Sequence, residues 1–146
     1  MKPAELQEIL VAHAQWLNHI RGGRRANLAM QDLRKFRLDR ALLRRAKLSG
    51  ANLAGVSMIG ADLEEADLFG TMLNGADLSG ANLEGADMRG AHLRGVHLEG
   101  ARLARADLRG GTMLVGASGN DGAKHDVKSF EHLSFDKANA GGADLS

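Results

Sequence analysis

Histidines are the residues of this chain best suited to chemistry, because six are present while cysteine and tyrosine are absent. The lack of cysteine excludes disulfides and thiolate metal ligands. His92 and His97 lie one short interval apart, and His125 and His132 lie further along the chain. A zinc site needs three or four ligands that converge on one point. Whether these histidines converge depends on the element that carries them.

A second pattern with chemical potential is the glycine spacing of GASGNDGAKHD, residues 116–126. The G-x-x-G-x-x-G spacing superficially suggests a phosphate-binding loop. Such a loop requires a preceding strand, a following helix and a lysine–serine pair, and the sequence supplies none of them here. Residues 116–127 are therefore predicted to form a glycine-rich loop or insertion.

The element that carries His92 and His97 repeats every five residues, as in GADLSGANLEGADMRGAHLRG, residues 75–95. Repeat centres run in register from Leu28 to Met113, giving 18 repeats whose centres are all leucine or methionine. Alanine precedes the centre by two residues in 12 of these repeats. A helix would spread the leucines around its surface, and a flat strand would alternate them between its faces. The chain must therefore turn a corner in every repeat.

Four sides of five residues close a square coil, so that residue n lies beside residue n+20 at roughly the 4.8 Å spacing of neighbouring strands. The 18 repeats then form about 4.5 coils of an all-β solenoid, a parallel β-helix. Glycine at the last position of many repeats suits a corner with positive φ. The residues predicted to define the core are Leu48, Leu53, Leu63, Leu68, Leu78, Leu83, Leu93, Leu98, Ala51, Ala61, Ala81 and Ala91.

The recurring A(D/N)LxG phrase resembles the tandem motif of the pentapeptide-repeat family over residues 26–115. This resemblance implies a right-handed quadrilateral β-helix and a bacterial source. Family members that confer quinolone resistance look like B-DNA in shape and charge, and they occupy the DNA site of gyrase. The resemblance therefore adds DNA mimicry to the candidate functions.

Four segments are expected along the chain. Residues 1–23 contain an amphipathic helix, 3–20, with Leu6, Ile9, Leu10, His13, Leu17 and Ile20 on one face. This helix is predicted to cover the first coil, because an uncovered sheet edge pairs with other chains. Residues 24–115 form the β-helix, 116–127 the loop, and 128–146 either further repeats out of phase or a C-terminal capping or association segment.

The repeat phase places His92 and His97 on adjacent outer sides, so they do not converge on a metal ion. A rod with a filled interior also lacks the concave pocket that an enzyme needs. The sequence predicts no enzyme activity, catalytic residue, cofactor or metal. No apolar run is long enough to span a membrane, and no secretion signal is apparent at Met1, so the cytoplasm is the expected location.

Charge is distributed in bands although the net charge is only +1. Residues 21–47 carry ten basic and two acidic side chains, residues 48–87 carry seven acidic and no basic ones, and residues 88–109 carry five basic and two acidic ones. Stacking of the coils places Arg44 over Glu64 and Arg45 over Glu65. Asp67, Asp87 and Asp107 fall in one column, where they are expected to form a hydrated ladder that accepts hydrogen bonds from turn backbone.

These features predict a non-catalytic protein-interaction or structural scaffold with an unidentified protein partner. The candidate partner-binding residues are Arg34, Arg37, Arg40, Arg44, Arg45, Phe69 and Met72. Gyrase binding by DNA mimicry is the first alternative, disfavoured because mimicry of the phosphate field needs a strongly acidic rod. Weak nucleic-acid binding through residues 21–47 is the second, disfavoured because stacking aromatics are lacking there. The C-terminal solenoid edge could also join a second copy, unless the chain is a fragment of a longer protein.

Overall fold

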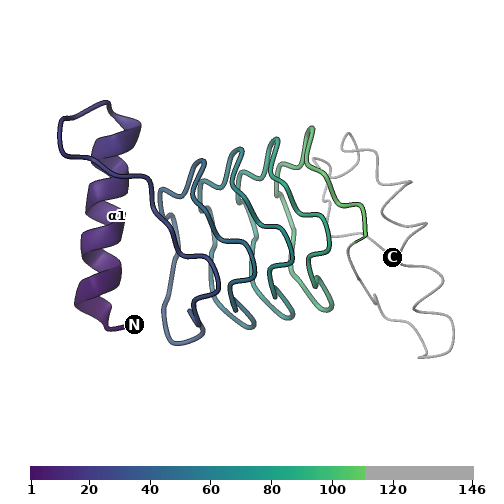
Figure 1. Ribbon diagram of the computed structural model, residues 1–146. Coiled ribbons are helices and arrows are strands. Elements are labelled where there is room, and N and C mark those ends of the chain that lie inside the picture. The colour runs from purple at the N-terminus through teal and green to yellow at the C-terminus, as the bar shows by residue number, and fades with distance from the viewer. Residues whose placement is uncertain (111–146) are drawn as a thin grey trace, which may run out of the picture.

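Residues twenty apart in the sequence lie side by side in the computed structural model, which describes residues 1–110. Parallel bridges join Asn27 to Lys47 and, at the other end of the stack, Asp87 to Asp107. Backbone hydrogen bonds run between the same coils, for example from the Leu48 amide to the Asp67 carbonyl at 2.8 Å. The predicted register of twenty is therefore confirmed, and Figure 1 shows the coils stacked along one axis.

Each side of the coil is too short to make an extended strand, because the chain turns after every five residues. Within residues 1–110 the sheet contacts are single parallel bridges instead. In the first coil the four sides are residues 26–30, 31–35, 36–40 and 41–45, and each later coil repeats them twenty residues on. We call these the first to fourth sides.

The corners are tight turns closed by a hydrogen bond between residues three apart, as from the Ala51 amide to the Leu48 carbonyl at 3.0 Å. At every corner of the described coils except that of Lys35, the residue before the closing amide has positive φ, which is 66° at Gly50, as the third residue of a type II turn requires. The predicted positive φ at the corners is thus confirmed. Five corners hold this conformation without glycine: Met30, Arg40, Arg45, Glu65 and Arg105.

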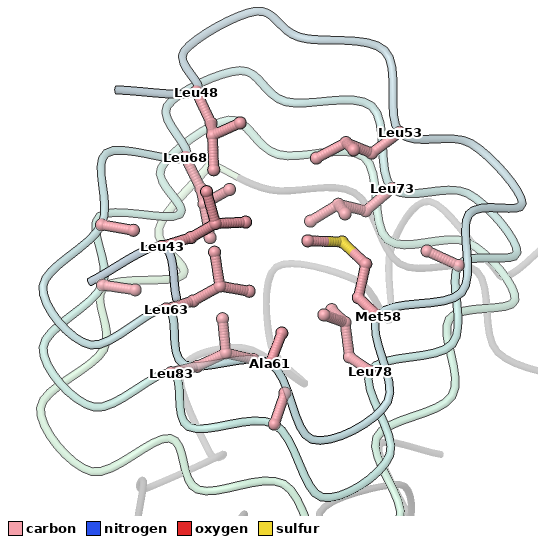
Figure 2. Packing of buried hydrophobic residues seen from close by; sticks show 14 of the residues in the cluster. Leu43, Leu48, Leu53, Met58, Ala61, Leu63, Leu68, Leu73, Leu78 and Leu83 are labelled. Atoms are coloured by element: carbon pink, nitrogen blue, oxygen red, sulfur yellow. The ribbon is translucent and has the colours of Figure 1, made fainter. Parts of the chain in front are cut away.

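The interior is filled by the repeat centres, which from Leu28 to Leu108 are at most 2% exposed. Figure 2 shows leucines of the four sides pointing toward one another, with Met58 among them. The residues that were predicted to define the core are all fully buried: Leu48, Leu53, Leu63, Leu68, Leu78, Leu83, Leu93, Leu98, Ala51, Ala61, Ala81 and Ala91. Burial of these side chains supplies the main stabilisation of the stack.

The one helix of the described residues, α1 (Pro3–Leu17), lies against the first coil at one end of the stack (Figure 1). Its apolar face packs on the core through Leu6, Ile9 and Leu10. The predicted helix extended to residue 20, and this boundary is wrong. The chain leaves the helix after Leu17, so Ile20 lies beyond it and is 53% exposed rather than packed.

After α1 the chain folds back along the helix and enters the first coil. A Cβ atom at Gly23 would lie 2.3 Å from the Trp16 amide nitrogen, so only glycine fits at this close approach. The Arg24 amide then donates to the Ala12 carbonyl at 2.9 Å. The predicted segments 116–127 and 128–146, and the repeat centre Met113, lie outside the described residues.

Candidate interaction surface

The outer surface consists of the residues just before and just after each repeat centre. On the first side, Asp67, Asp87 and Asp107 each accept a hydrogen bond from the backbone amide two residues on, at 3.1, 3.2 and 3.1 Å. The predicted hydrogen bonds from this column to turn backbone are therefore confirmed. The guanidinium of Arg89 binds both carboxylate oxygens of Asp87 at 2.8 Å, which lowers the pKa of that carboxyl.

The predicted basic residues surround the first coil instead of sharing one face. Arg34 lies on the second side, Arg37 and Arg40 on the third, and Arg44 and Arg45 on the fourth. Because they point away from one another around the rod, a single flat partner cannot contact all five.

Four of these five arginines already bind carboxylates of the same chain. Arg34 binds Asp32 at 2.8 Å, and Arg37 binds Asp39 at 2.5 Å. The other two pair with the next coil, Arg44 with Glu64 and Arg45 with Glu65 at 3.3 Å, as the sequence predicted. Of these five arginines, only Arg40 makes no ion pair within residues 1–110.

Asp39 joins the first coil to the second. One of its oxygens accepts hydrogen bonds from the Ser57 hydroxyl at 2.5 Å and from the Ile59 amide at 2.9 Å. The Ser57 hydroxyl and the Arg37 guanidinium lower the pKa of Asp39 to about 2. Its charge is therefore part of the connection between the two coils.

The acidic band is neutralised in the same way on the fourth side. Glu84 lies between the side chains of Arg102 and Arg105 on the next coil and pairs with both, the Arg105 contact being 3.7 Å. On the fourth side, ion pairs between coils therefore join the basic and acidic bands. Elsewhere six of the ten basic side chains of residues 21–47 make no ion pair within residues 1–110: Arg21, Arg24, Arg25, Lys35, Arg40 and Lys47.

Two large apolar side chains remain outside beside one corner. Phe69 is 51% exposed on the first side, and Met72 is 36% exposed on the second. They flank Gly70, where no heavy atom lies within 4 Å of an added Cβ. We call this corner, with its stacked residues Met30, Gly50, Gly70, Gly90 and Gly110, the Gly70 edge.

Met30, at the start of the Gly70 edge, is 79% exposed, and its sulfur lies over Gly50. The corner between the third and fourth sides carries a second apolar pair, Leu42 and Ile59, which are 52% and 41% exposed. This corner, which begins at Arg40, is the Arg40 edge. It lies diagonally opposite the Gly70 edge and provides a matched control for it.

The structure keeps the candidate metal ligands apart. Within residues 1–110 no group of three or more histidine or carboxylate side chains could hold a metal ion. His92 and His97 lie on the second and third sides, and the Nδ1 atom of His97 is 3.8 Å from a Glu99 oxygen. His125 and His132 lie outside the described residues.

His13 lies on the apolar face of α1, but its structural role includes hydrogen bonds that this location does not indicate. Its side chain is fully buried between α1 and the first coil. The Ala26 amide donates to Nδ1 at 2.9 Å, so Nε2 carries the proton and donates to the Arg44 carbonyl at 2.9 Å. The ring stacks on Trp16 with centroids 5.5 Å apart. The apolar face predicted for the helix includes His13, whereas the two hydrogen-bond partners of the ring depend on how the helix docks.

Thr71, at a position where most repeats have alanine, is the other buried polar side chain of the described residues. Its hydroxyl donates toward the Leu68 carbonyl at 2.7 Å and lies 3.1 Å from the Leu48 carbonyl. Threonine is tolerated at this small position because its oxygen is satisfied inside the coil. It serves packing and offers nothing to a partner.

Among the described elements, no helix combines the length and apolarity required to cross a lipid bilayer. Two grooves border α1 where it meets the first coil. The larger, of about 500 Å³, is lined by Trp16, Leu17, His19, Ile20, Arg44 and Arg45. Its arginines are engaged with Glu64 and Glu65 on their other side.

Solved structures with similar coils are up to 38% identical to this chain over the aligned residues. Rfr23, a pentapeptide-repeat protein from the cyanobacterium Cyanothece 51142, is 38% identical over 60% of this chain and 53% of its own, with a TM-score of 0.41. QnrB1, a plasmid-mediated fluoroquinolone resistance protein, is 24% identical over 58% and 49%, with a TM-score of 0.41. HetL, involved in heterocyst differentiation regulation in Nostoc, is 30% identical over 62% and 56%, with a TM-score of 0.34.

The aligned region thus spans about half of each of these proteins. No curated protein matches the chain significantly. The family profile "Pentapeptide repeats" matches residues 24–58, 37–75, 46–85 and 72–110 with eight copies, which is more than half of the chain. This match follows the five-residue phase that positions every core leucine, and the chain belongs to the pentapeptide-repeat family.

Proposed function

We propose that this chain is a non-catalytic interaction module whose partner is a protein that contacts the Gly70 edge. The observation that carries the proposal is the exposure of Phe69 and Met72 together, 51% and 36%, beside one corner of the rod. Aromatic, methionine and arginine side chains are enriched where protein interfaces are fully buried. Phe69, Met72 and the neighbouring Arg89 are of these three kinds.

The backbone of the Gly70 edge favours close contact. Gly70 and Gly90 project no side chain there, so a partner can approach the corner between Phe69 and Met72. Alanine-scanning hot spots typically combine an aromatic residue or an arginine with such an accessible site. The Arg40 edge offers Leu42 and Ile59, but no aromatic ring.

The remaining parts of the chain support this module in the proposal. Helix α1 acts as a cap on the first coil, which prevents its edge from pairing indiscriminately. The C-terminal edge that the sequence predicts for the solenoid is the candidate contact for a second copy. The proposed location is the bacterial cytoplasm.

DNA mimicry at gyrase remains the alternative, and QnrB1 is described as a fluoroquinolone resistance protein. Mimicry requires a surface on which uncompensated carboxylates repeat like phosphates. Here the net charge is +1, and Glu64, Glu65 and Glu84 pair with arginines. Six basic side chains of the segment 21–47 make no ion pair within residues 1–110, but the segment lacks aromatic side chains for base stacking other than Phe36. We therefore favour a protein partner recognised through apolar contact.

The proposal is tested with three immobilised baits in lysate of the source organism at pH 8. The baits are the wild type, Phe69→Ser/Met72→Ser, and the matched control Leu42→Ser/Ile59→Ser. A protein retained by the wild type and the control but lost by the first variant supports the Gly70 edge. Equal retention by all three contradicts it, and capture of gyrase subunits would favour the mimicry alternative. Circular dichroism establishes that each bait is folded.

Arg40 is tested separately, because it is the predicted basic residue without an ion pair in the described part of the chain. Arg40→Glu alters the charge of the Arg40 edge without breaking a contact to a carboxylate. Loss of the partner with this bait would move the interface to that edge. By contrast, Arg44→Glu/Arg45→Glu would also disrupt the ion pairs with Glu64 and Glu65. A loss of the partner with that variant could then result either from the altered surface or from a less stable fold.

A further inference from the structure

His13 replaces backbone groups that a preceding coil would provide. In later coils the amide at the first position of a repeat donates to the carbonyl three residues earlier, as Ala46 does to Leu43 at 3.0 Å. Ala26 begins the first coil, and its amide donates instead to His13 Nδ1 at 2.9 Å. One aromatic nitrogen thus serves as the missing carbonyl.

The other ring nitrogen replaces a missing amide. Within the stack, the carbonyl that follows a repeat centre accepts from the coil before it, as Glu64 does from the Arg45 amide at 2.9 Å. The corresponding carbonyl in the first coil belongs to Arg44, and it accepts from His13 Nε2 at 2.9 Å. The single imidazole therefore connects α1 to both the beginning and the end of the first coil.

This connection exists only while His13 is neutral. In the neutral ring one nitrogen accepts and the other donates, whereas in the imidazolium both nitrogens donate. Protonation would place an Nδ1–H group against the Ala26 N–H group, and the hydrogen bond between them would be lost. The positive charge would also be fully buried, which is unfavourable without a carboxylate partner.

The surroundings of His13 offer no such carboxylate in the described residues. Its neighbours one turn away on α1 are Ile9, Leu10, Trp16 and Leu17. Glu8 of α1 lines the groove beside Ala26 together with Arg24 and Arg25, and no carboxylate is among the groups that shift the pKa of His13. On the other side of the ring, Arg44 and Arg45 hold Glu64 and Glu65 in their own ion pairs.

Burial lowers the pKa of His13 from its ordinary value of 6.5 by more than the hydrogen bond to the Arg44 carbonyl raises it, and the charge of Arg25 lowers it further.

We propose that His13 is an acid-sensitive latch, whose protonation separates helix α1 from the first coil. This inference rests on the proposed capping role of α1. Separation relieves the opposed donors and brings the imidazolium into water, while the coils keep their own hydrogen bonds. It also uncovers the Ala26 amide and the Arg44 carbonyl, which become available to the edge of a second copy.

Hydrogen exchange measured by mass spectrometry between pH 8 and pH 4, corrected for intrinsic rates, tests the latch. The expected result is a loss of protection in residues 3–17 with a midpoint below pH 6.5, while residues 61–90 remain protected. Trp16 is the only tryptophan of the chain, and its emission reports protonation of the stacked ring independently. If Trp16 emission titrates while protection of residues 3–17 is unchanged, protonation does not open the latch and the proposal fails.

Two variants assign the step to His13. His13→Gln retains a donor for the Arg44 carbonyl but does not titrate, so the pH step in residues 3–17 should disappear. The control His19→Gln changes an exposed histidine beyond the helix and should leave the step in place. A step that persists in His13→Gln overturns the proposal.

If His13→Gln does not fold, the variant Arg25→Gln tests the latch in its place. This variant removes the cation that opposes protonation and retains an amide donor for the Arg45 carbonyl, which Arg25 Nε contacts at 2.5 Å. The midpoint should then rise, and an unchanged midpoint argues against the latch. Partner capture at the Gly70 edge is measured at pH 8, without acidification. A negative result in that experiment can therefore be distinguished from a negative result in the pH titration that tests the latch.

Discussion

Arg89 lies one coil beyond Phe69, and its guanidinium carbon is 5.5 Å from the centre of the Phe69 ring. The same guanidinium binds Asp87 through two hydrogen bonds of 2.8 Å. The carboxylate therefore holds the cation over the ring, and the ring keeps one face toward solvent. An exposed aromatic side chain fixed in this way loses less conformational entropy on binding than a free one.

A double-mutant cycle measures this arrangement. Phe69→Leu combined with Arg89→Gln should give a coupling free energy of about 0.5 kcal/mol in urea unfolding, the range of an exposed cation–π contact. Arg109 is the control, because it binds Asp107 at 2.7 Å in the same way but lies one coil beyond Arg89 rather than over a ring. Coupling between Phe69 and Arg109 as large as that with Arg89 would contradict a direct contact.

Replacement of a central leucine should destabilise the stack far more than replacement of an outer one. Leu63 is fully buried, so Leu63→Ala is expected to cost about 2–5 kcal/mol through lost contacts and a cavity. Leu42 is 52% exposed, and Leu42→Ala should change the free energy of unfolding by less than about 0.5 kcal/mol. Chemical denaturation measures both, and similar values for the two would show that the assignment of inner and outer positions is wrong.

Corner glycines should differ according to the space around them. Gly70 has φ of 63° and no atom within 4 Å of an added Cβ, so Gly70→Ala should cost about 1 kcal/mol from backbone strain alone. At Gly50 the added Cβ would lie 2.3 Å from the Met30 sulfur, which must also move. Gly50→Ala is therefore expected to be worse, and Met30→Ala should remove the excess. Equal melting temperatures for Gly50→Ala with and without Met30 would argue against this contact.

Acid should weaken the connection between the first two coils through Asp39. Its pKa falls from 3.8 to about 2 on folding, so the unfolded chain binds the proton more readily. The stabilisation is complete above about pH 4 and is lost as the pH falls through about 2. Ser57→Ala removes the principal cause of the lowered pKa of Asp39. The difference in unfolding free energy between wild type and Ser57→Ala should therefore become smaller as the pH falls from about 4 to about 2. A difference that stays constant down to pH 2 would contradict the assigned role of Ser57.

His13 acts in a higher window with the same sign, because its folded-state pKa is also lowered. The unfolded chain takes up the proton below about pH 6.5, and stability therefore decreases as the pH falls below this value. In thermal unfolding, wild type should lose stability between pH 7 and pH 5 relative to His13→Gln. Parallel curves for the two proteins would show that His13 has no linked titration.

Reversing both charges of a cross-coil ion pair should restore the stability that is lost when only one charge is reversed. Arg44→Glu places a third carboxylate beside Glu64 and Asp62, the two partners of Arg44, and should cost up to about 1 kcal/mol. Adding Glu64→Arg should recover most of this loss at low salt. Recovery that is absent in urea unfolding would indicate that the pair contributes nothing measurable.

The repeating parts of this protein can be predicted from the amino-acid sequence. Because the same five positions recur from Leu28 onward, one local conformation has to satisfy them all, and this fixes the corners, the interior and the register of twenty. Arg44 over Glu64 followed from that register without any structure. The exposure of Phe69 and Met72 followed from their phase in the repeat.

The side-chain contacts that do not recur from repeat to repeat became known from the three-dimensional structure. The pairing of His13 with the Ala26 amide and the Arg44 carbonyl depends on the position of α1, which no period encodes. The early end of α1 at Leu17 depends on the return of the chain past Gly23. Likewise, Arg34 and Arg37 bind aspartates two residues away on their own sides, because side-chain rotamers choose among several carboxylates within reach. Periodicity constrains the backbone of every repeat at once, whereas a single contact depends on the packing of all the groups around it.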